Sequence, residues 1–156
     1  MGYYVELIDF NAKLLEKDFD EAYRLMCDLN NDNSNKTGGR YPREDKDGPH
    51  NGVWFAWMDW NYPETCNNVK EILTALGFEY FEHEDGIIPC SYNDKTGAEE
   101  LFLNSIAHLW VPYNSHDGFG NALDPFFAWR GEDGGMWRIR YADGNAIEES
   151  AVIVWE

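Results

Sequence analysis

The sequence predicts an α+β fold with a mixed, mostly antiparallel sheet, three helices and a C-terminal β-meander. A length of 156 residues is typical of one domain, so we expect a single acidic domain spanning residues 1–156. Apolar residues recur at helical spacing in three segments, and short apolar segments bounded by turn residues fill much of the remainder. The chain is 44% hydrophobic, which is enough to build a core without disulfides or metals.

The N-terminal third alternates between regular and irregular patterns. Residues 2–9 alternate in polarity and predict a first strand. Residues 18–29 predict the first helix, because Asp18 and Glu21 have the spacing of a capping box. Residues 30–52 are rich in Asn, Gly, Pro and charge, and predict a long flexible loop.

The central third predicts a strand, a helix and a hairpin. Residues 53–60 form an aromatic-rich strand pattern. Residues 63–76 carry the apolar stripe of a second helix, which Gly77 would end. Residues 78–83 and 87–92 flank Glu-Asp-Gly, a hairpin signal.

The C-terminal third predicts one helix and the closing strands. Thr96 and Glu99 form a second capping box, which opens a third helix that continues to Leu109. Three closing strands follow, at residues 126–130, 136–141 and 151–156. From Val53 to about Arg130 the element order is βαββαβ, which predicts a ferredoxin-like centre.

The strongest functional signal is charge. Twelve Lys and Arg stand against 29 Asp and Glu, a net charge of −17, whereas magnitudes of ~2–8 are usual for a small domain. Such a surface repels nucleic acid and membranes and attracts basic partners. The N-terminus does not resemble a signal peptide and no apolar run approaches a membrane span, so we expect a cytoplasmic protein.

Acidic residues concentrate in the central third, where they could imitate the phosphates of a nucleic acid. A basic protein surface would then bind these carboxylates, with exposed aromatic residues adding local fit. The alternative is a solvated surface that promotes solubility. The expected partner-binding residues are Asp59, Glu79, Glu82, Glu84, Asp85, Glu99, Trp60 and Tyr62.

The long loop holds the second candidate site, a binding site for a nucleotide. Its residues Lys36, Thr37, Gly38, Arg40 and Arg43 combine positive charge with a glycine pair that could cradle a phosphate. The spacing of a standard phosphate-binding loop is missing. The alternative is a loop that becomes ordered on contact with a partner.

No catalytic motif stands out. His116 and Asp117 could form half of an acid/base pair, but no nucleophile motif accompanies them. The three cysteines are odd in number and far apart, and the Asx-rich segment 28–34 departs from a calcium loop. We therefore expect no enzyme, no cofactor and no metal; an enzyme using Asp117 and Asp124 is the last alternative.

Several segments resemble small acidic proteins of unassigned function encoded by bacteriophages and prophages. The segments are YYVELIDFN, KTGGR, WFAWMD, KEILTALGFE, DKTGAEELF, WRGEDGGMWRIRYADG and the final VWE, and together they cover most of the length. This resemblance implies a mobile-element context, in which compact acidic proteins often block host defence nucleases, as anti-restriction and anti-CRISPR inhibitors do.

Three functional hypotheses follow. The leading one is a non-enzymatic inhibitor that binds the nucleic-acid-binding surface of a host defence protein. The second is a sponge that sequesters a nucleotide signal of a defence pathway. The third is an immunity protein that neutralises a basic toxin nuclease.

Overall fold

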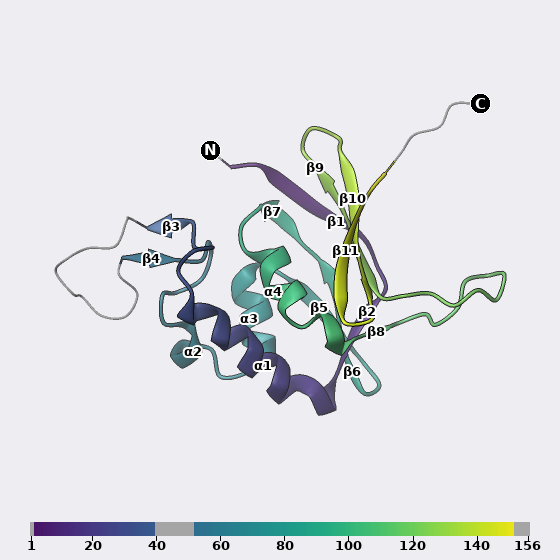
Figure 1. The fold of residues 1–156 in the computed structure, drawn as a ribbon, viewed down its shortest axis with the longest axis horizontal. Coiled ribbons are helices and arrows are strands. Elements are labelled where there is room, and N and C mark those ends of the chain that lie inside the picture. The colour runs from purple at the N-terminus through teal and green to yellow at the C-terminus, as the bar shows by residue number, and fades with distance from the viewer. Residues whose placement is uncertain (1, 40–51, 152–156) are drawn as a thin grey trace. The chain divides into compact units, whose positions relative to one another are not determined.

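The structure, a computed structural model, describes residues 2–39 and 52–151 of the chain (Figure 1). It is an α+β protein with antiparallel sheets, as the sequence predicts. The chain forms two compact units. Unit 1 comprises residues 1–18, 78–96 and 107–156, and unit 2 comprises residues 19–77 and 97–106. Both units therefore combine segments that are far apart in the sequence.

The larger sheet of unit 1 has five antiparallel strands in the order β11-β10-β9-β1-β7. Its C-terminal meander β9-β10-β11 confirms the prediction of consecutive closing hairpins. The β10–β11 turn has positive φ at Asp143 and Gly144 (54° and 77°), as a tight hairpin turn requires. The strands are β1 (Tyr4–Phe10), β7 (Asn93–Lys95), β9 (Phe126–Gly131), β10 (Met136–Ala142) and β11 (Asn145–Ser150).

The second sheet of unit 1 has four antiparallel strands in the order β5-β6-β2-β8. The predicted β5–β6 hairpin is confirmed, with His83 opposite Gly86 across a two-residue turn. Strand β2 was not predicted; it follows β1 after the buried Asn11, whose amide oxygen accepts the Asn114 backbone N–H at 2.6 Å. The strands are β2 (Ala12–Leu15), β5 (Glu79–His83), β6 (Gly86–Ser91) and β8 (Trp110–Pro112), and the short 3-10 helices are η1 (Glu16–Asp18) and η3 (Ala107–Leu109).

Aromatic rings dominate the core of unit 1. The Trp129 ring lies 5.7 Å from Tyr92 and 6.2 Å from Phe78, measured between centroids. A second group joins Trp110 to Phe127 at 5.0 Å. These edge-to-face contacts add to the free energy of burial and fix how the strands pack.

Unit 2 contains the helices and a two-stranded ladder. The predicted second helix is split: Cys66 is extended (φ −100°, ψ 125°), and Asn68 restarts the helix by accepting the Glu71 N–H at 2.9 Å. Gly77 ends it with φ 113°, as expected. The elements are α1 (Phe19–Asp28), η2 (Leu29–Asn31), β3 (Gly38–Gly39), β4 (Val53–Trp54), α2 (Tyr62–Thr65), α3 (Val69–Leu76) and α4 (Glu99–Ser105).

The core of unit 2 forms around three rings that meet at 5.2–6.2 Å, those of Phe55, Tyr62 and Phe102. Tyr62 also donates its hydroxyl to the Met26 carbonyl at 2.6 Å. That carbonyl belongs to the last turn of α1, where backbone acceptors have no partner within the helix.

The expected ferredoxin-like centre is not found among the described residues. Its strands belong to three sheets: β4 pairs with β3, β5 pairs with β6 in the four-stranded sheet, and β9 lies between β1 and β10. The predicted strand 53–60 ends at Trp54 because residues 55–58 form a turn, with the Met58 N–H bonded to the Phe55 carbonyl at 3.0 Å. Trp57 in this turn has φ 72°, outside the range of a strand.

Two further boundaries differ from the prediction. The last strand covers Asn145–Ser150, and residues 152–156 lie outside the described residues. Helix α4 begins at Glu99, and Thr96 instead donates its backbone N–H to the Tyr3 carbonyl at 2.7 Å. Most of the predicted long loop, residues 40–51, also lies outside the described residues.

Candidate functional site

The candidate site with the strongest charge is the β5–β6 hairpin of unit 1. Glu79, Glu82, Glu84 and Asp85 all lie on its exposed surface, and we call these four residues the acidic hairpin. Glu84 and Asp85 form its turn, and Glu84 has a left-handed φ of 48°. The next residue, Gly86, has no room for a side chain, because a Cβ there would lie 2.3 Å from the Leu14 carbonyl oxygen. The hairpin is therefore held closely against β2.

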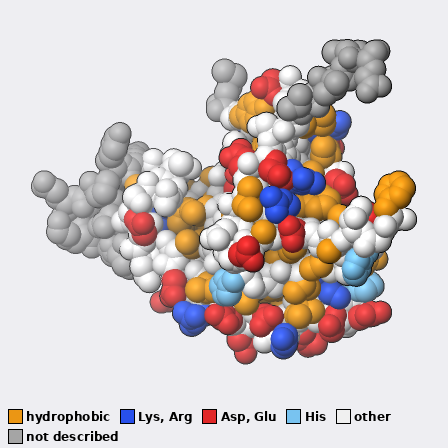
Figure 2. Space-filling model, turned by 45° about the vertical axis from the view of Figure 1, so that its right-hand side comes forward, with side chains coloured by type: hydrophobic (Ala, Val, Ile, Leu, Met, Phe, Trp, Pro, Cys, Tyr) orange, Lys and Arg blue, Asp and Glu red, His pale blue; other side chains and the backbone are white. Residues whose placement is uncertain are grey.

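One lysine partly neutralises this cluster. The Lys13 ammonium lies 3.0 Å from the Asp85 carboxylate, and its hydrogen bond lowers the pKa of Asp85. The Asp85 carbonyl accepts the Glu16 N–H at 2.7 Å, which brings a further exposed acid beside the turn. Figure 2 shows acidic side chains spread widely over the visible face, with fewer basic ones among them.

Aromatic side chains accompany the acidic hairpin. Phe81 and Tyr113 are 36% and 37% exposed, and their ring centroids lie 6.1 Å apart. His83 packs against Tyr113 at 4.9 Å, and Phe10 packs against Phe81 at 6.3 Å. The His83 Nδ1 atom is buried without a hydrogen-bond partner. A partly exposed aromatic cluster beside charged groups is typical of a protein-binding hot spot.

This aromatic cluster was not predicted. The alternation in β5 places Phe81 and His83 on one face, which the sequence could have indicated. Tyr113 directly follows β8, 30 residues after His83 in the chain, and β8 lies at the opposite edge of the sheet from β5, so only the packing of the side chains reveals that contact.

Two of the expected surface residues are buried. Glu99 is 2% exposed, and its carboxylate accepts the Gly97 N–H at 2.6 Å near the start of α4. Tyr62 is 1% exposed and belongs to the aromatic core, where burial raises the pKa of its hydroxyl. Neither contributes to an exposed surface in this structure. Asp59 and Trp60 are exposed, but they belong to unit 2, whereas the acidic hairpin belongs to unit 1.

The expected nucleotide site is only partly described. The Lys36 ammonium donates to the Asn30 carbonyl at 2.8 Å and to Asn33 Oδ1 at 2.7 Å, and it lies 5.5 Å from the Phe55 ring centroid. Burial lowers the pKa of Lys36. These contacts engage the ammonium in holding residues 30–36 together, which leaves it poorly placed to bind a phosphate.

The neighbouring residues of that site form a ladder with β4. Thr37 is exposed, and Gly38 lies opposite Trp54, whose Nε1 would lie 2.4 Å from a Cβ on this glycine. The glycine pair thus makes room for an indole ring. Arg40 and Arg43 lie outside the described residues.

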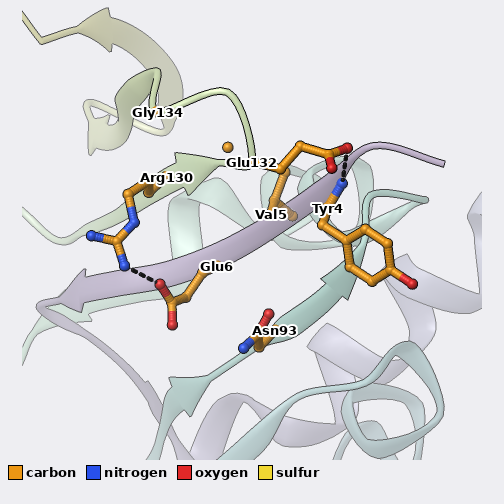
Figure 3. Close-up of a pocket in the computed structure, with 8 residues that line it drawn as sticks. Tyr4, Val5, Glu6, Asn93, Arg130, Glu132 and Gly134 are labelled. Atoms are coloured by element: carbon orange, nitrogen blue, oxygen red, sulfur yellow. Dashed lines mark hydrogen bonds and ion pairs between the residues drawn. The ribbon is translucent and has the colours of Figure 1, made fainter.

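A pocket of about 310 Å³ lies on unit 1 (Figure 3). The Arg130 guanidinium pairs with the Glu6 carboxylate on one side of it, and the Glu132 carboxylate accepts the Tyr4 N–H at 3.0 Å on the other. Asn93 lies below them in Figure 3. The lining combines hydrogen-bond donors and acceptors with a similar amount of apolar surface. Its residues come from β1, β7, β9 and the β9–β10 turn, which explains why the sequence did not indicate it.

The structure also describes the surroundings of the remaining sequence candidates. Asp117 accepts three hydrogen bonds from its own loop, and the His116 ring lies 3.0 Å from the Ser115 hydroxyl. Burial raises the pKa of all three cysteine thiols. Across residues 2–39 and 52–151, no three His, Cys, Asp or Glu side chains lie close enough together to hold a metal ion.

No helix within the described ranges combines the length and hydropathy that crossing a membrane requires. Comparisons with protein-family models, with curated proteins and with solved structures gave no match for this chain.

Proposed function

We propose that this protein is a non-enzymatic inhibitor that binds the basic nucleic-acid-binding surface of a host defence protein. The observation that carries the proposal is the acidic hairpin with the aromatic cluster of Phe10, Phe81, His83 and Tyr113 beside it. The carboxylates attract a basic surface, and the aromatic rings offer apolar area that ordinary solubilising acidic surfaces lack.

Rigidity supports this role. The hairpin turn is tied to β2 through Lys13 and the close approach at Gly86, and to η1 through Glu16, so its carboxylates are displayed on a fixed backbone. Binding through such a preorganised surface loses little conformational entropy. An immunity protein that neutralises a toxin nuclease would use the same surface, and the identity of the captured partner distinguishes the two.

The nucleotide-sponge alternative has weaker support. Its described lysine, Lys36, already donates to two oxygen atoms. The net charge of −17 on the chain would also repel the phosphates of a nucleotide.

The first experiment is capture of partners from a lysate of cells that naturally carry the gene, with elution by a salt gradient. We expect a nucleic-acid-binding protein that is released by salt and displaced by added DNA, because duplex and inhibitor would compete for one basic surface. Capture of a small molecule without a protein would instead favour the sponge.

The decisive variant reverses two acids of the hairpin, Glu79→Lys with Glu84→Lys. We expect association to slow by about tenfold or more at low salt, because charges at an interface mainly set the association rate. The matched control, Glu64→Lys with Glu148→Lys, changes the net charge equally at two other exposed acids. Surface plasmon resonance with the captured partner measures the association rate of each double variant. Equal slowing in the two would contradict a localised acidic site.

A further inference from the structure

The solvent-exposed face of the five-stranded sheet carries a compact group of charged, amide and aromatic side chains around the pocket of Figure 3. Strand pairing places Glu6 opposite Arg130 on one side and opposite Asn93 on the other. Tyr4, two residues before Glu6, lies opposite Glu132, whose backbone N–H donates to the Tyr4 carbonyl at 2.9 Å. Side chains alternate between the two faces of a sheet, so these five project from one face, and the intervening residues of β1 and β9 are buried. We call the space that they line the β1–β9 pocket.

The turn from β9 to β10 forms a preformed wall of this pocket. The Gly131 N–H donates to the Gly135 carbonyl at 2.8 Å, and the Gly134 N–H donates to the Gly131 carbonyl at 2.9 Å. Asp133 in the same turn accepts the Gly135 N–H at 2.9 Å and the Tyr3 hydroxyl. Position 131 has no room for a side chain, because a Cβ there would lie 1.7 Å from that hydroxyl oxygen. The wall therefore exists before a ligand binds, which lowers the entropy cost of binding.

Two carboxylate oxygens of the pocket are available to a ligand. Glu6 pairs with the Arg130 guanidinium through its Oε1 atom, and Glu132 accepts the Tyr4 N–H through its own Oε1 atom at 3.0 Å. The Oε2 atom of each carboxylate has no hydrogen bond or ion pair among the residues that the structure describes. Both acids line the same pocket, so one ligand can contact both. The pocket thus offers two charged acceptors, the strongest kind for a cationic donor.

The charges of the lining favour a cation over an anion. The eight lining residues include two acids, Glu6 and Glu132, and one base, Arg130. An anion attracted by Arg130 would compete with Glu6 for its guanidinium and would also approach Glu132. A cation meets a net negative lining and forms new ion pairs without breaking the existing one.

The polarity and shape of the lining favour a guanidinium among cations. Polar groups and apolar surface contribute about equally to the lining, and the Tyr4 ring, 45% exposed, is its aromatic part. In Figure 3 this ring and Arg130 lie on opposite sides of Glu6. A guanidinium donates N–H bonds from its edge and stacks its weakly hydrated faces on aromatic rings, whereas an ammonium is a strongly hydrated point charge. Arg130 already shows that Glu6 accepts a guanidinium.

We propose that the β1–β9 pocket binds a guanidinium group, which donates to the Oε2 atoms of Glu6 and Glu132 and stacks on the Tyr4 ring. The pocket volume of about 310 Å³ is at the lower limit for ligand pockets and admits one arginine side chain or one small guanidine. The inference goes beyond the proposed function, because this pocket and the acidic hairpin lie on different sheets and share no residue.

Titration of the full-length chain with N-acetyl-L-arginine methylamide, followed by amide NMR, tests this assignment. We expect saturable shifts at Glu6, Asn93 and Gly131 with a dissociation constant on the order of 1 mM, because one small group makes few contacts. N-acetyl-L-lysine methylamide carries the same charge and should bind at least fivefold more weakly. Free L-arginine distinguishes the two sources of a guanidinium. Tighter binding than the capped compound indicates a free amino acid, and equal or weaker binding indicates an arginine within a peptide chain.

Variants of the lining test whether binding occurs in the pocket. Glu6→Gln and Glu132→Gln should each weaken binding of the capped arginine at least fivefold, because each removes one charged acceptor. The matched control, Glu148→Gln, removes the same charge from an exposed acid of β11 and should change binding less than twofold. Arg130→Met should strengthen binding about threefold, because the lining loses its one base. Such a gain cannot result from unfolding, and the melting temperature checks the other variants.

Four results would overturn the proposal: shifts that do not saturate by about 20 mM, shifts centred on the acidic hairpin, equal binding of the capped lysine, or weaker binding by Arg130→Met. The last result would assign the pocket to an anion. Glu79→Lys with Glu84→Lys should change binding of the capped arginine less than twofold at physiological salt, because the two sites are separate and salt screens distant charges. The pocket and the acidic hairpin can therefore fail independently.

Discussion

Asp117 shows how one side chain determines local order. Hydrogen bonds from the Asn121 side chain and from the Asn121 and Phe119 backbone lower the pKa of its carboxyl group. A carboxyl group whose pKa is lower in the folded state stabilises that state at neutral pH, and this contribution is lost as the pH falls through the lowered pKa. The turn at residues 117–121 should accordingly keep its order down to the ordinary aspartate pKa of about 3.9 and lose it only as the pH falls through the lowered pKa of Asp117.

Amide NMR shifts of Phe119 and Asn121 across an acid titration would measure this transition. Asp117→Asn is the matched control, because its amide oxygen can still accept the two backbone N–H groups but does not titrate. A transition of the same size in the Asn variant would show that another group controls the loop.

Tyr62 is a second residue whose role depends on one atom. Its hydroxyl is buried and donates to the Met26 carbonyl at the end of α1. Tyr62→Phe keeps the ring contacts but leaves that carbonyl without this donor, so we expect the free energy of unfolding to fall by about 1–2 kcal/mol. Urea denaturation measures the change, and an unchanged midpoint would mean that the carbonyl finds another donor.

At the level of secondary-structure elements, the acidic hairpin depends on its contact with β2. Gly86→Ala would place a methyl group against the Leu14 carbonyl, and we expect it to cost about 2 kcal/mol of stability or more because the two nearest atoms, the oxygen and carbon of that carbonyl, belong to the backbone. Gly118→Ala is the control, since nothing lies within 4 Å of its Cβ position. Thermal unfolding of both variants tests this, and equal melting temperatures would show that β6 can move away from β2.

The elements also show where sequence patterns succeed. The helix from Phe19, the β5–β6 hairpin and the stop at Gly77 were predicted correctly, because each depends on residues adjacent in the sequence. The strand predicted for 53–60 failed at Trp57. Its aromatic and apolar composition suited a strand, but the Trp57 backbone adopts φ 72° within a turn, and of the three residues that follow only Met58 is buried.

For the whole molecule, repulsion between like charges is the main electrostatic effect. The described residues of unit 1 include sixteen acids and six bases, and those of unit 2 include nine acids and three bases. Each unit therefore repels itself, and salt should stabilise the fold by screening this repulsion.

We expect the melting temperature to rise by several degrees between about 20 mM and 500 mM NaCl, since about 1 kcal/mol corresponds to 2–4 °C for a chain of this size. Salt also weakens exposed ion pairs such as Arg138–Glu149, but each of these pairs contributes little to stability, so this opposing effect is small. Differential scanning calorimetry at constant pH measures the shift. A fall in melting temperature with salt would show that ion pairs outweigh the repulsion.

Composition and local pattern were enough to predict the α+β class, the C-terminal meander and the acidic hairpin, because net charge, turn residues and short-range periodicity are properties of neighbouring residues. They were not enough to predict which strands share a sheet. The pairing of β1 with β9 joins residues 117 to 126 positions apart, and the same pairing creates the pocket at Arg130 and Glu6. Burial of Glu99 and Tyr62 likewise depends on how distant segments pack, since a side chain's accessibility is set by neighbours in space and not by its neighbours in the chain.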